Sequence, residues 1–436
     1  MKTKPTLSFL AFVSLLFLGN ILIAQTSENM PAFIFGDALP DAPELAPRGD
    51  YPIGVRTLEV VNPSQLDFAK AKEGKVPTYD RPLTLEVWYP AIIPEGQVAL
   101  TEYTDMLGRP NTEERPLTPF TFQGRALRDA KLDRSDQAFP LVIVSHGYPG
   151  SRYLLSYLSE NLASKGYVVV AIDHTESTHG DAGPFASTLM NRSLDILFVL
   201  DEMAEMAEKN SNSFLSESLD ANNTALIGYS MGGYGVLNVA GAGYSKGMIA
   251  AFSQMTGGST AIEARTMSAP DLVAAPDERI KAVVAFAPWG MARGSWDAEG
   301  LAGLRIPTFF VAGDQDDVSG YENGIKAIYD GAINTERYML TYVNARHNVA
   351  PNPPPAVTIN SDKYYPDFMH YAEPAWDQRR INNINQHFVT AFLGIRLKGL
   401  DYGHYLELPE NSNAETWEGF KPRTSVGLEL RKGMKE

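Results

Sequence analysis

Residues 225–233 read Ala-Leu-Ile-Gly-Tyr-Ser-Met-Gly-Gly, and this stretch decides the fold. Its first three residues are apolar and suit a buried strand, whereas residues 236–239 beyond the glycines suit a helix. A Gly-x-Ser-x-Gly sequence between a strand and a helix is typical of a sharp turn that presents its serine at the strand end. Side chains at Gly228 or Gly232 would clash in that turn, and the helix N-terminus favours developing negative charge. We therefore expect Ser230 to be a nucleophile; the alternative is a glycine-rich turn without chemistry.

Short apolar runs recur on both sides of this turn. They lie at residues 141–144, 167–172, 225–227, 280–286 and 308–311, with a more polar run at 338–343. Such runs are typical of strands buried on both faces of a parallel sheet. Helical spacing appears between them at 194–209 and after them at 381–395, where Pro374 fits a first helical position and Gly394 falls near the end. This alternation predicts an α/β fold with a mostly parallel, doubly wound sheet.

Two further strands are expected before the first buried run, at residues 51–62 and 81–90. Residues 83–89 alternate between apolar and polar side chains, which is the period of a half-buried strand. We expect both strands to extend the sheet in antiparallel fashion. The polar stretch 95–137 shows no strong periodicity.

The composition excludes several classes of protein. The 436 residues include 52 acidic and 37 basic side chains, and the formal net charge of −15 argues against nucleic-acid binding. There is no cysteine, so disulfides, a thiol nucleophile and cysteine-ligated zinc are impossible.

The chain divides into a leader, one large domain and a tail. Residues 1–24 combine two lysines with an apolar run and end at a small residue, which predicts a secretory signal and a secreted or periplasmic protein; the alternative is an uncleaved membrane anchor. Residues 25–50 are rich in Pro, Ala and Asp and suggest a solvated leader. We expect one domain over 51–400 and a C-terminal tail over 401–436 that packs on it. Two long irregular stretches, the insert 241–279 and the proline-rich 348–373, are expected to form cap or lid loops.

A serine nucleophile needs a base, and the base needs an orienting acid that follows the serine in the chain. The strand at 308–311 runs into Gly313 and then Asp314, Asp316 and Asp317. A carboxylate after a strand end is where this acid belongs. We favour Asp316, with Asp314 second and Asp317 third.

The base is expected just past the next strand, where His347 follows the run 338–343. His370, in the proline-rich stretch, is the second candidate. His387 falls on the apolar side of the last helix and is expected to be a packed core histidine.

Acyl transfer also needs N–H donors for the oxyanion. One is expected at Met231, directly after the nucleophile, and the other at Tyr148, in the turn that follows the strand at 141–144. His146 in the same turn is expected to be structural rather than a base.

Four possible ligands of a divalent cation cluster after the strand at 167–172, namely Asp173, His174, His179 and Asp181. Their spacing matches no specific metal motif, so a polar loop beside the cleft is favoured. We expect no metal and no cofactor.

These residues resemble a known family. Trp88-Tyr89-Pro90, His146-Gly147, the stretch 228–233, Gly313-Asp314-Gln315-Asp316 and His347 are similar to motifs of the α/β-hydrolases grouped with platelet-activating-factor acetylhydrolase and dienelactone hydrolase-like proteins. The resemblance covers roughly residues 50–400 and implies the α/β-hydrolase fold. In that family the acid is commonly the third residue after the glycine, which supports Asp316.

A narrower similarity links Met231, Tyr148 and Trp289 to bacterial cutinases and polyester hydrolases. It implies an aromatic oxyanion residue at Tyr148 and a substrate-binding tryptophan at Trp289. Trp296 is a further candidate for an aromatic pocket.

The sequence therefore predicts a serine hydrolase that cleaves carboxylic esters through an acyl-enzyme. The expected partner is a small or polymeric ester. The alternatives are a polyester or cutinase-like hydrolase, a serine peptidase of the same fold and a noncatalytic binding module.

Overall fold

The centre of the fold is a parallel sheet whose strands are buried on both faces. A computed structural model describes residues 33–134, 138–265 and 276–436. The predicted signal at 1–24 lies outside these residues. The parallel strands are β7 (Phe139–Ser145), β8 (Val168–Asp173), β9 (Leu219–Tyr229), β10 (Ile280–Phe286), β11 (Thr308–Gly313) and β12 (Arg337–Tyr342). Each contains one of the predicted runs, or all but one terminal residue of it, because a strand covered on both faces cannot expose polar side chains to water.

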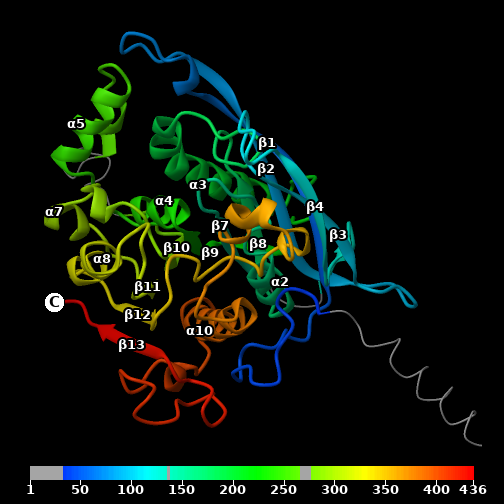
Figure 1. Cartoon of the computed structure of the whole chain (residues 1–436). Coiled ribbons are helices and arrows are strands. Elements are labelled where there is room, and N and C mark those ends of the chain that lie inside the picture. Colours follow the sequence, from blue (N-terminus) through cyan, green and yellow to red (C-terminus); the bar gives the residue numbers. More distant parts are fainter. Residues whose placement is uncertain (1–32, 135–137, 266–275) are drawn as a thin grey trace, which may run out of the picture. The chain divides into compact units, whose positions relative to one another are not determined.

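Antiparallel strands extend both edges of this sheet. They are β1 (Ile53–Leu66), β2 (Thr78–Ile92) and β13 (Leu428–Gly433), with short additions from β5 (Leu127–Arg128) and β6 (Lys131–Leu132). The order is β13-β12-β11-β10-β9-β7-β8-β2-β1-β5, with β6 paired to β2. Figure 1 shows β13 in red at one edge and β1 and β2 in blue and cyan toward the other. The predicted antiparallel pairing of β1 and β2 is confirmed.

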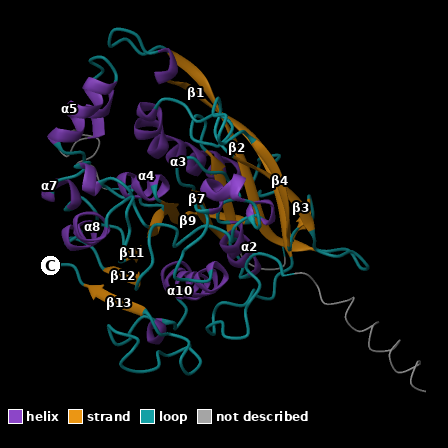
Figure 2. Ribbon diagram, in the orientation of Figure 1, coloured by secondary structure: helices purple, strands orange, loops and turns teal. Residues whose placement is uncertain are grey.

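Helices cover both faces of the sheet (Figure 2). One hydrophobic core joins one face to α2 (Ser156–Ser164) and α10 (Gln378–Lys398). A second core joins the other face to α3 (Phe185–Ala207), α4 (Met231–Val239), α5 (Lys246–Met255), α7 (Ala298–Leu301) and α8 (Lys326–Gly331). Side chains of β7 alternate between the two cores, with Val142 in the first and Ile143 in the second, as a strand period of two requires. This arrangement confirms the predicted α/β architecture.

Two insertions lie beside the ends of the parallel strands. One is the separate hairpin of β3 (Thr101–Leu107) and β4 (Thr118–Gly124), which falls in the polar stretch where no strand was expected. The other is the proline-rich stretch, which contains η5 (Ala356–Thr358), η6 (Asp362–Tyr364) and α9 (Tyr365–Phe368). The remaining short helices are η1 (Phe68–Lys70), η2 (Ala261–Arg265), η3 (Met291–Arg293), η4 (Tyr321–Ile325) and η7 (Gly403–Tyr405).

The described part of the segment 25–50 is not a solvated leader. Residues from Phe35 onward belong to the same compact unit as the rest of the chain. Arg48 pairs with Asp37 at 2.6 Å and with the buried Glu160 of α2 at 3.0 Å, and the N–H of Leu45 donates to His387 of α10 at 3.1 Å. Residues 33–50 form no helix or strand, and polar partners on two helices hold this backbone in place.

The last helix begins later than predicted. Asp377 caps it by accepting a hydrogen bond from the N–H of Arg379, so Pro374 lies before the helix rather than at its first turn. Gly394 lies inside the helix, which ends at Gly399 in a left-handed conformation. Within the residues that the structure describes, no helix combines the length and apolar character needed to cross a bilayer.

Candidate active site

Ser230 sits at a strained turn between β9 and α4. Its backbone has φ 54° and ψ −112°, which a non-glycine residue rarely adopts. A Cβ on Gly228 would lie 2.2 Å from the carbonyl oxygen of Gly232, and one on Gly232 would lie 1.9 Å from that of Ser145. The two glycines are therefore required by close backbone approach, as the sequence pattern indicated.

The structure brings Ser230, His347 and Asp316 together. His347 Nε2 lies 3.0 Å from Ser230 Oγ, and His347 Nδ1 lies 2.8 Å from Asp316 Oδ2. Because a carboxylate can only accept, Nδ1 carries the proton and Nε2 is free to accept the Ser230 hydroxyl proton. All three side chains are buried, with Ser230 and His347 each 8 % exposed at the floor of a cavity.

Asp316 is oriented by its own turn. Its Oδ1 accepts the N–H groups of Val318 at 2.9 Å and Ser319 at 2.7 Å, which leaves Oδ2 for His347. Burial raises the pKa of this carboxyl, but the hydrogen bonds from His347 and from the two N–H groups outweigh burial and hold it below the usual value. The carboxyl is thus ionised at neutral pH.

The two competing aspartates have other partners. Asp314 accepts the N–H of Asn344 at 2.7 Å, and Asp317 forms an ion pair with Arg346. Neither reaches His347 in the structure.

The other candidate histidines do not reach Ser230. His370 donates from Nε2 to the carbonyl of Pro149 at 3.2 Å, and burial lowers its pKa to about 3. His387 is fully buried among aromatic side chains of the core, as predicted.

The turn after β7 lies against the serine. A Cβ on Gly147 would be 3.6 Å from Ser230 Cβ, and Tyr148 lines the same cavity. Met231 begins α4, where the first N–H groups of a helix have no intrahelical acceptor. Among the described residues, no acceptor is recorded for the N–H of Tyr148 or Met231. Both groups therefore remain available to a ligand.

His146 is structural in its contacts. It lies 2.6 Å from the Gly147 carbonyl through Nδ1, and it accepts the N–H of His174 at Nε2 at 3.2 Å. It is 1 % exposed and does not line the cavity.

A second Ser-His-Asp chain lies beneath this turn. His174 Nε2 is 2.9 Å from Ser145 Oγ, and His174 Nδ1 is 2.9 Å from Asp195 Oδ2. Both oxygens of Asp195 also accept from Arg81, at 2.8 and 3.0 Å. Ser145 is 0 % exposed, so its hydroxyl cannot meet a substrate and this chain supports the turn instead.

The candidate metal ligands contact other groups of the protein instead of a common point. Asp173 pairs with Arg152, His179 contacts the carbonyl of Gly108 at 3.0 Å, and Asp181 accepts backbone N–H groups. Across 33–134, 138–265 and 276–436, no group of three or more such side chains could hold a metal ion.

Trp289 is not among the residues that line the cavity. Its indole packs against Phe185 and Tyr234, at ring distances of 5.4 and 6.0 Å, and the backbone N–H of Trp289 donates to the carbonyl of Ser230 at 3.1 Å. Tyr148 also packs on Phe185, so Trp289 lies one ring away from the cavity wall. Trp296 is a core residue that is 2 % exposed and donates to Asn238 at 2.9 Å.

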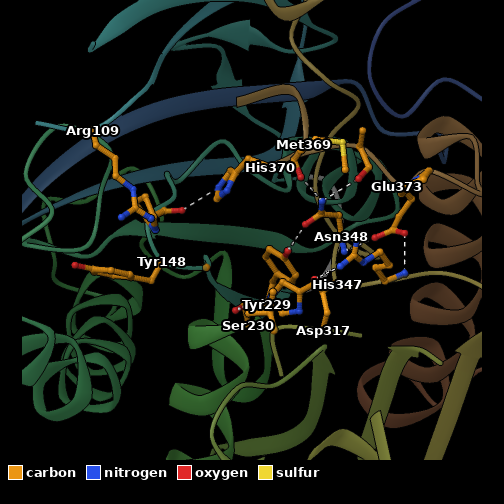
Figure 3. A pocket seen from close by; sticks show the side chains of 16 residues that line it. Arg109, Tyr148, Tyr229, Ser230, Asp317, His347, Asn348, Met369, His370 and Glu373 are labelled. Carbon is orange, nitrogen blue, oxygen red and sulfur yellow. Dashed lines mark hydrogen bonds and ion pairs between the residues drawn. The ribbon is translucent and has the colours of Figure 1, made fainter. Parts of the chain in front are cut away.

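The cavity has a volume of about 380 Å³ and is bounded by both insertions. Arg109 comes from the loop between β3 and β4, whereas Met369, His370 and Glu373 come from the proline-rich stretch. Figure 3 shows Arg109 and Tyr148 on one side of the cavity and His347 and Glu373 on the other.

Glu373 is a part of the site that the sequence did not indicate. Its Oε2 accepts the N–H of Arg346 at 2.7 Å and its Oε1 that of Asn348 at 2.6 Å, so one carboxylate holds the backbone on both sides of His347. Asn348 in turn accepts from Tyr229 at 3.1 Å. No periodicity marks an acid that binds backbone 25 residues away, so only the fold reveals it.

The chain is similar to several known hydrolases. The PETase family, described as PET hydrolase-like, matches residues 133–277, a stretch that includes Ser230 but neither Asp316 nor His347. A ferulic acid esterase from Streptomyces cinnamoneus superposes with a TM-score of 0.54 at 19% identity, over 82% of this chain and 94% of that one. The chain has the α/β-hydrolase fold.

The chain is also similar to several named cutinases. It is 26% identical over 220 residues to cutinase est1 of Thermobifida alba, which covers 50% of this chain and 56% of that protein. It is 23% identical over 221 residues to cutinase 2 of Thermobifida cellulosilytica, which covers 51% and 64%. The chain thus spans less than two thirds of the length of the curated relatives that it matches.

Proposed function

We propose that this protein is a carboxylic ester hydrolase that works through an acyl-enzyme on Ser230. The hydrogen-bonded chain Ser230–His347–Asp316 at the floor of a cavity carries the proposal. The cutinase relatives and the ferulic acid esterase support the reaction class.

In the proposed mechanism, His347 transfers a proton in each step. His347 takes the hydroxyl proton of Ser230 as Oγ bonds to the ester carbonyl carbon, and Asp316 stabilises the imidazolium. The carbonyl oxygen gains negative charge and is bound by the N–H groups of Met231 and Tyr148. His347 then gives its proton to the leaving alcohol, and the C–O bond breaks. Water attacks the acyl-enzyme by the same path, which releases the acid and restores Ser230.

The test combines a serine probe with a matched control. Ser230→Ala should lower the hydrolysis of short acyl esters by about a thousandfold or more and abolish labelling by a fluorophosphonate. Ser145→Ala removes a second serine that is hydrogen-bonded to a histidine in the described part of the chain, and this variant should still be labelled because Ser145 is 0 % exposed. Undiminished turnover by Ser230→Ala would refute the proposal, and a wild-type protein that resists the probe would favour a noncatalytic module.

A second candidate is hydrolysis of a polyester, which the PETase match and the cutinase relatives favour. Trp289 would contact those parts of a long substrate that extend past Tyr148 along the Phe185 ring. Release of acid from a polyester film, at a rate comparable to that with soluble esters, would support this candidate. A rate at the level of Ser230→Ala would exclude it.

Export is the remaining part of the proposal. Residues 1–24 carry the composition of a secretory signal, and a 51–400 domain with its flanking segments would then be the exported enzyme. N-terminal sequencing of protein recovered outside the cytoplasm should begin near Gln25. An intact Met1 in that fraction would contradict cleavage.

A further inference from the structure

The charged side chains around Ser230 are almost all neutralised by the protein itself. Asp317 pairs with Arg346, and Glu373 accepts two backbone N–H groups. His347 is bonded to Asp316, and His370 to a carbonyl. A substrate therefore meets no unbalanced charge from these groups.

Arg109 is the exception within the described part of the cavity lining. It is exposed and lines the cavity, yet no hydrogen bond, ion pair or ring contact of its guanidinium is recorded among the described residues. In a chain of net charge −15, a cation left without an acid in the lining of the cavity that holds Ser230 calls for a ligand.

The loop that carries Arg109 is held firmly. The N–H of Gly108 donates to Asp367 at 3.2 Å, and the carbonyl of Gly108 contacts His179 at 3.0 Å. Arg115, across the loop, forms an ion pair with Asp367 and accepts the N–H of Arg109 at 2.9 Å through its carbonyl. Asp367 belongs to α9, so the two insertions brace each other and fix the backbone that presents the guanidinium.

We infer that Arg109 binds a carboxylate at the far end of the substrate's acyl group, so that the preferred substrates are half-esters of dicarboxylic acids. This inference rests on the proposed function. The leaving alcohol must lie beside His347 to receive its proton, and Figure 3 shows His347 on the opposite side of the cavity from Arg109 and Tyr148. The acyl group is then left to extend toward Arg109. A guanidinium matches a carboxylate in shape and charge and can bind it through two parallel hydrogen bonds.

Paired substrates isolate this contact. For succinate, glutarate, adipate and pimelate, kcat/KM is measured for the monomethyl and the dimethyl ester, which differ only in the free carboxylate. The ratio of kcat/KM for the monomethyl ester to that for the dimethyl ester should fall about five- to tenfold in Arg109→Gln at the best chain length. This fall should be smaller at high salt, because the site is open to solvent. Arg305→Gln is the matched control, since Arg305 is exposed and precedes β11, at the opposite end of the parallel strands from Ser230. It should leave the ratio unchanged.

A binding measurement separates this inference from the proposed function. Ser230→Ala and the Ser230→Ala/Arg109→Gln double variant are titrated calorimetrically with monomethyl adipate and its homologues, which requires no turnover. Weaker binding by the double variant, by about five- to tenfold, supports the inference even if the enzyme cleaves no ester. Equal affinities, or an unchanged ratio in an active enzyme, overturn it while the serine hydrolase proposal stands.

Discussion

Asp316 is the aspartate that orients His347, although two more aspartates lie within two residues of it. Three aspartates follow one strand, and their spacing alone does not choose between them. The turn after β11 determines which aspartate contacts His347, because two backbone N–H groups bind one oxygen of Asp316 and leave its second oxygen facing His347. Asp314 and Asp317 have other partners.

We therefore expect unequal effects from three isosteric substitutions. Asp316→Asn should lower kcat by about a thousandfold or more, because an amide there no longer fixes the tautomer of His347 or stabilises its protonated form. Asp314→Asn and Asp317→Asn should each cost less than about tenfold. Steady-state kinetics on one short ester decide the matter, and a larger loss at Asp314 or Asp317 would reassign the acid.

Glu373 is a positioning residue whose effect is measurable. Glu373→Gln keeps the shape but turns an NH2 group toward one of two N–H donors, which leaves a buried donor unpaired. We expect kcat to fall about tenfold with little change in KM, and the exposed control Glu415→Gln to behave as wild type.

The pH dependence distinguishes this role from a general loss of stability. Burial raises the pKa of Glu373 above its usual value, although both backbone N–H groups oppose the shift. Its carboxylate therefore becomes protonated at a higher pH than an exposed glutamate would. Once protonated, it has one fewer oxygen that can accept a backbone N–H. The ratio of wild-type to Glu373→Gln kcat should shrink as the pH falls from 7 toward 5. A constant ratio would show that the carboxylate does not act on His347.

At the scale of elements, α3 supports the turn that holds Tyr148. Arg192 is 1 % exposed on this helix and donates to the carbonyl of His146 at 2.6 Å and to that of Gly147 at 3.4 Å. The N–H of Tyr148 belongs to the same peptide plane as the Gly147 carbonyl, so anchoring that carbonyl fixes the direction of the N–H.

Loss of this anchor should slow the chemical step. Arg192→Met should lower kcat by about ten- to a hundredfold with a nearly unchanged KM, because a displaced oxyanion donor matters most in the transition state. Arg192→Lys can still donate to a carbonyl, so its kcat should lie between that of wild type and that of Arg192→Met. Glu205→Gln, on an exposed position of α3, is the control. A folded Arg192→Met variant with full kcat would contradict the assignment.

The elements themselves were predictable in unequal measure. Buried strands such as β7 and β10 are nearly all apolar, so their sequence leaves no alternative. The β3–β4 hairpin and β13 were not predicted because their strands lie at edges or outside the main sheet, where polar side chains remain in water. Chain order indicated Ser230 and His347, whereas Arg109 and Glu373 depend on contacts between insertions distant in sequence.

At the scale of the whole molecule, Lys165 ties together three segments. Its Nζ lies 2.5 Å from the carbonyl oxygen of Leu45, 2.7 Å from Oδ1 of Asn161 in α2 and 2.8 Å from Oγ1 of Thr390 in α10. The segment that looked like a solvated leader is thereby joined to the helices of one face. Burial and the charge of Arg48 lower the pKa of Lys165 to about 7.

This lowered pKa predicts how the free energy of unfolding depends on pH. The ordinary lysine pKa is 10.5, so between pH 7 and about 10 the unfolded chain holds a proton that the folded protein has released. The free energy of unfolding then rises with pH across that window, with a slope that corresponds to the release of at most one proton. Lys165→Met removes this contribution, so its urea midpoints at pH 7.5, 8.5 and 9.5 should rise less than those of wild type. Lys246→Met, at an exposed position, should follow wild type, and parallel curves for wild type and Lys165→Met would show that Lys165 titrates as an ordinary lysine.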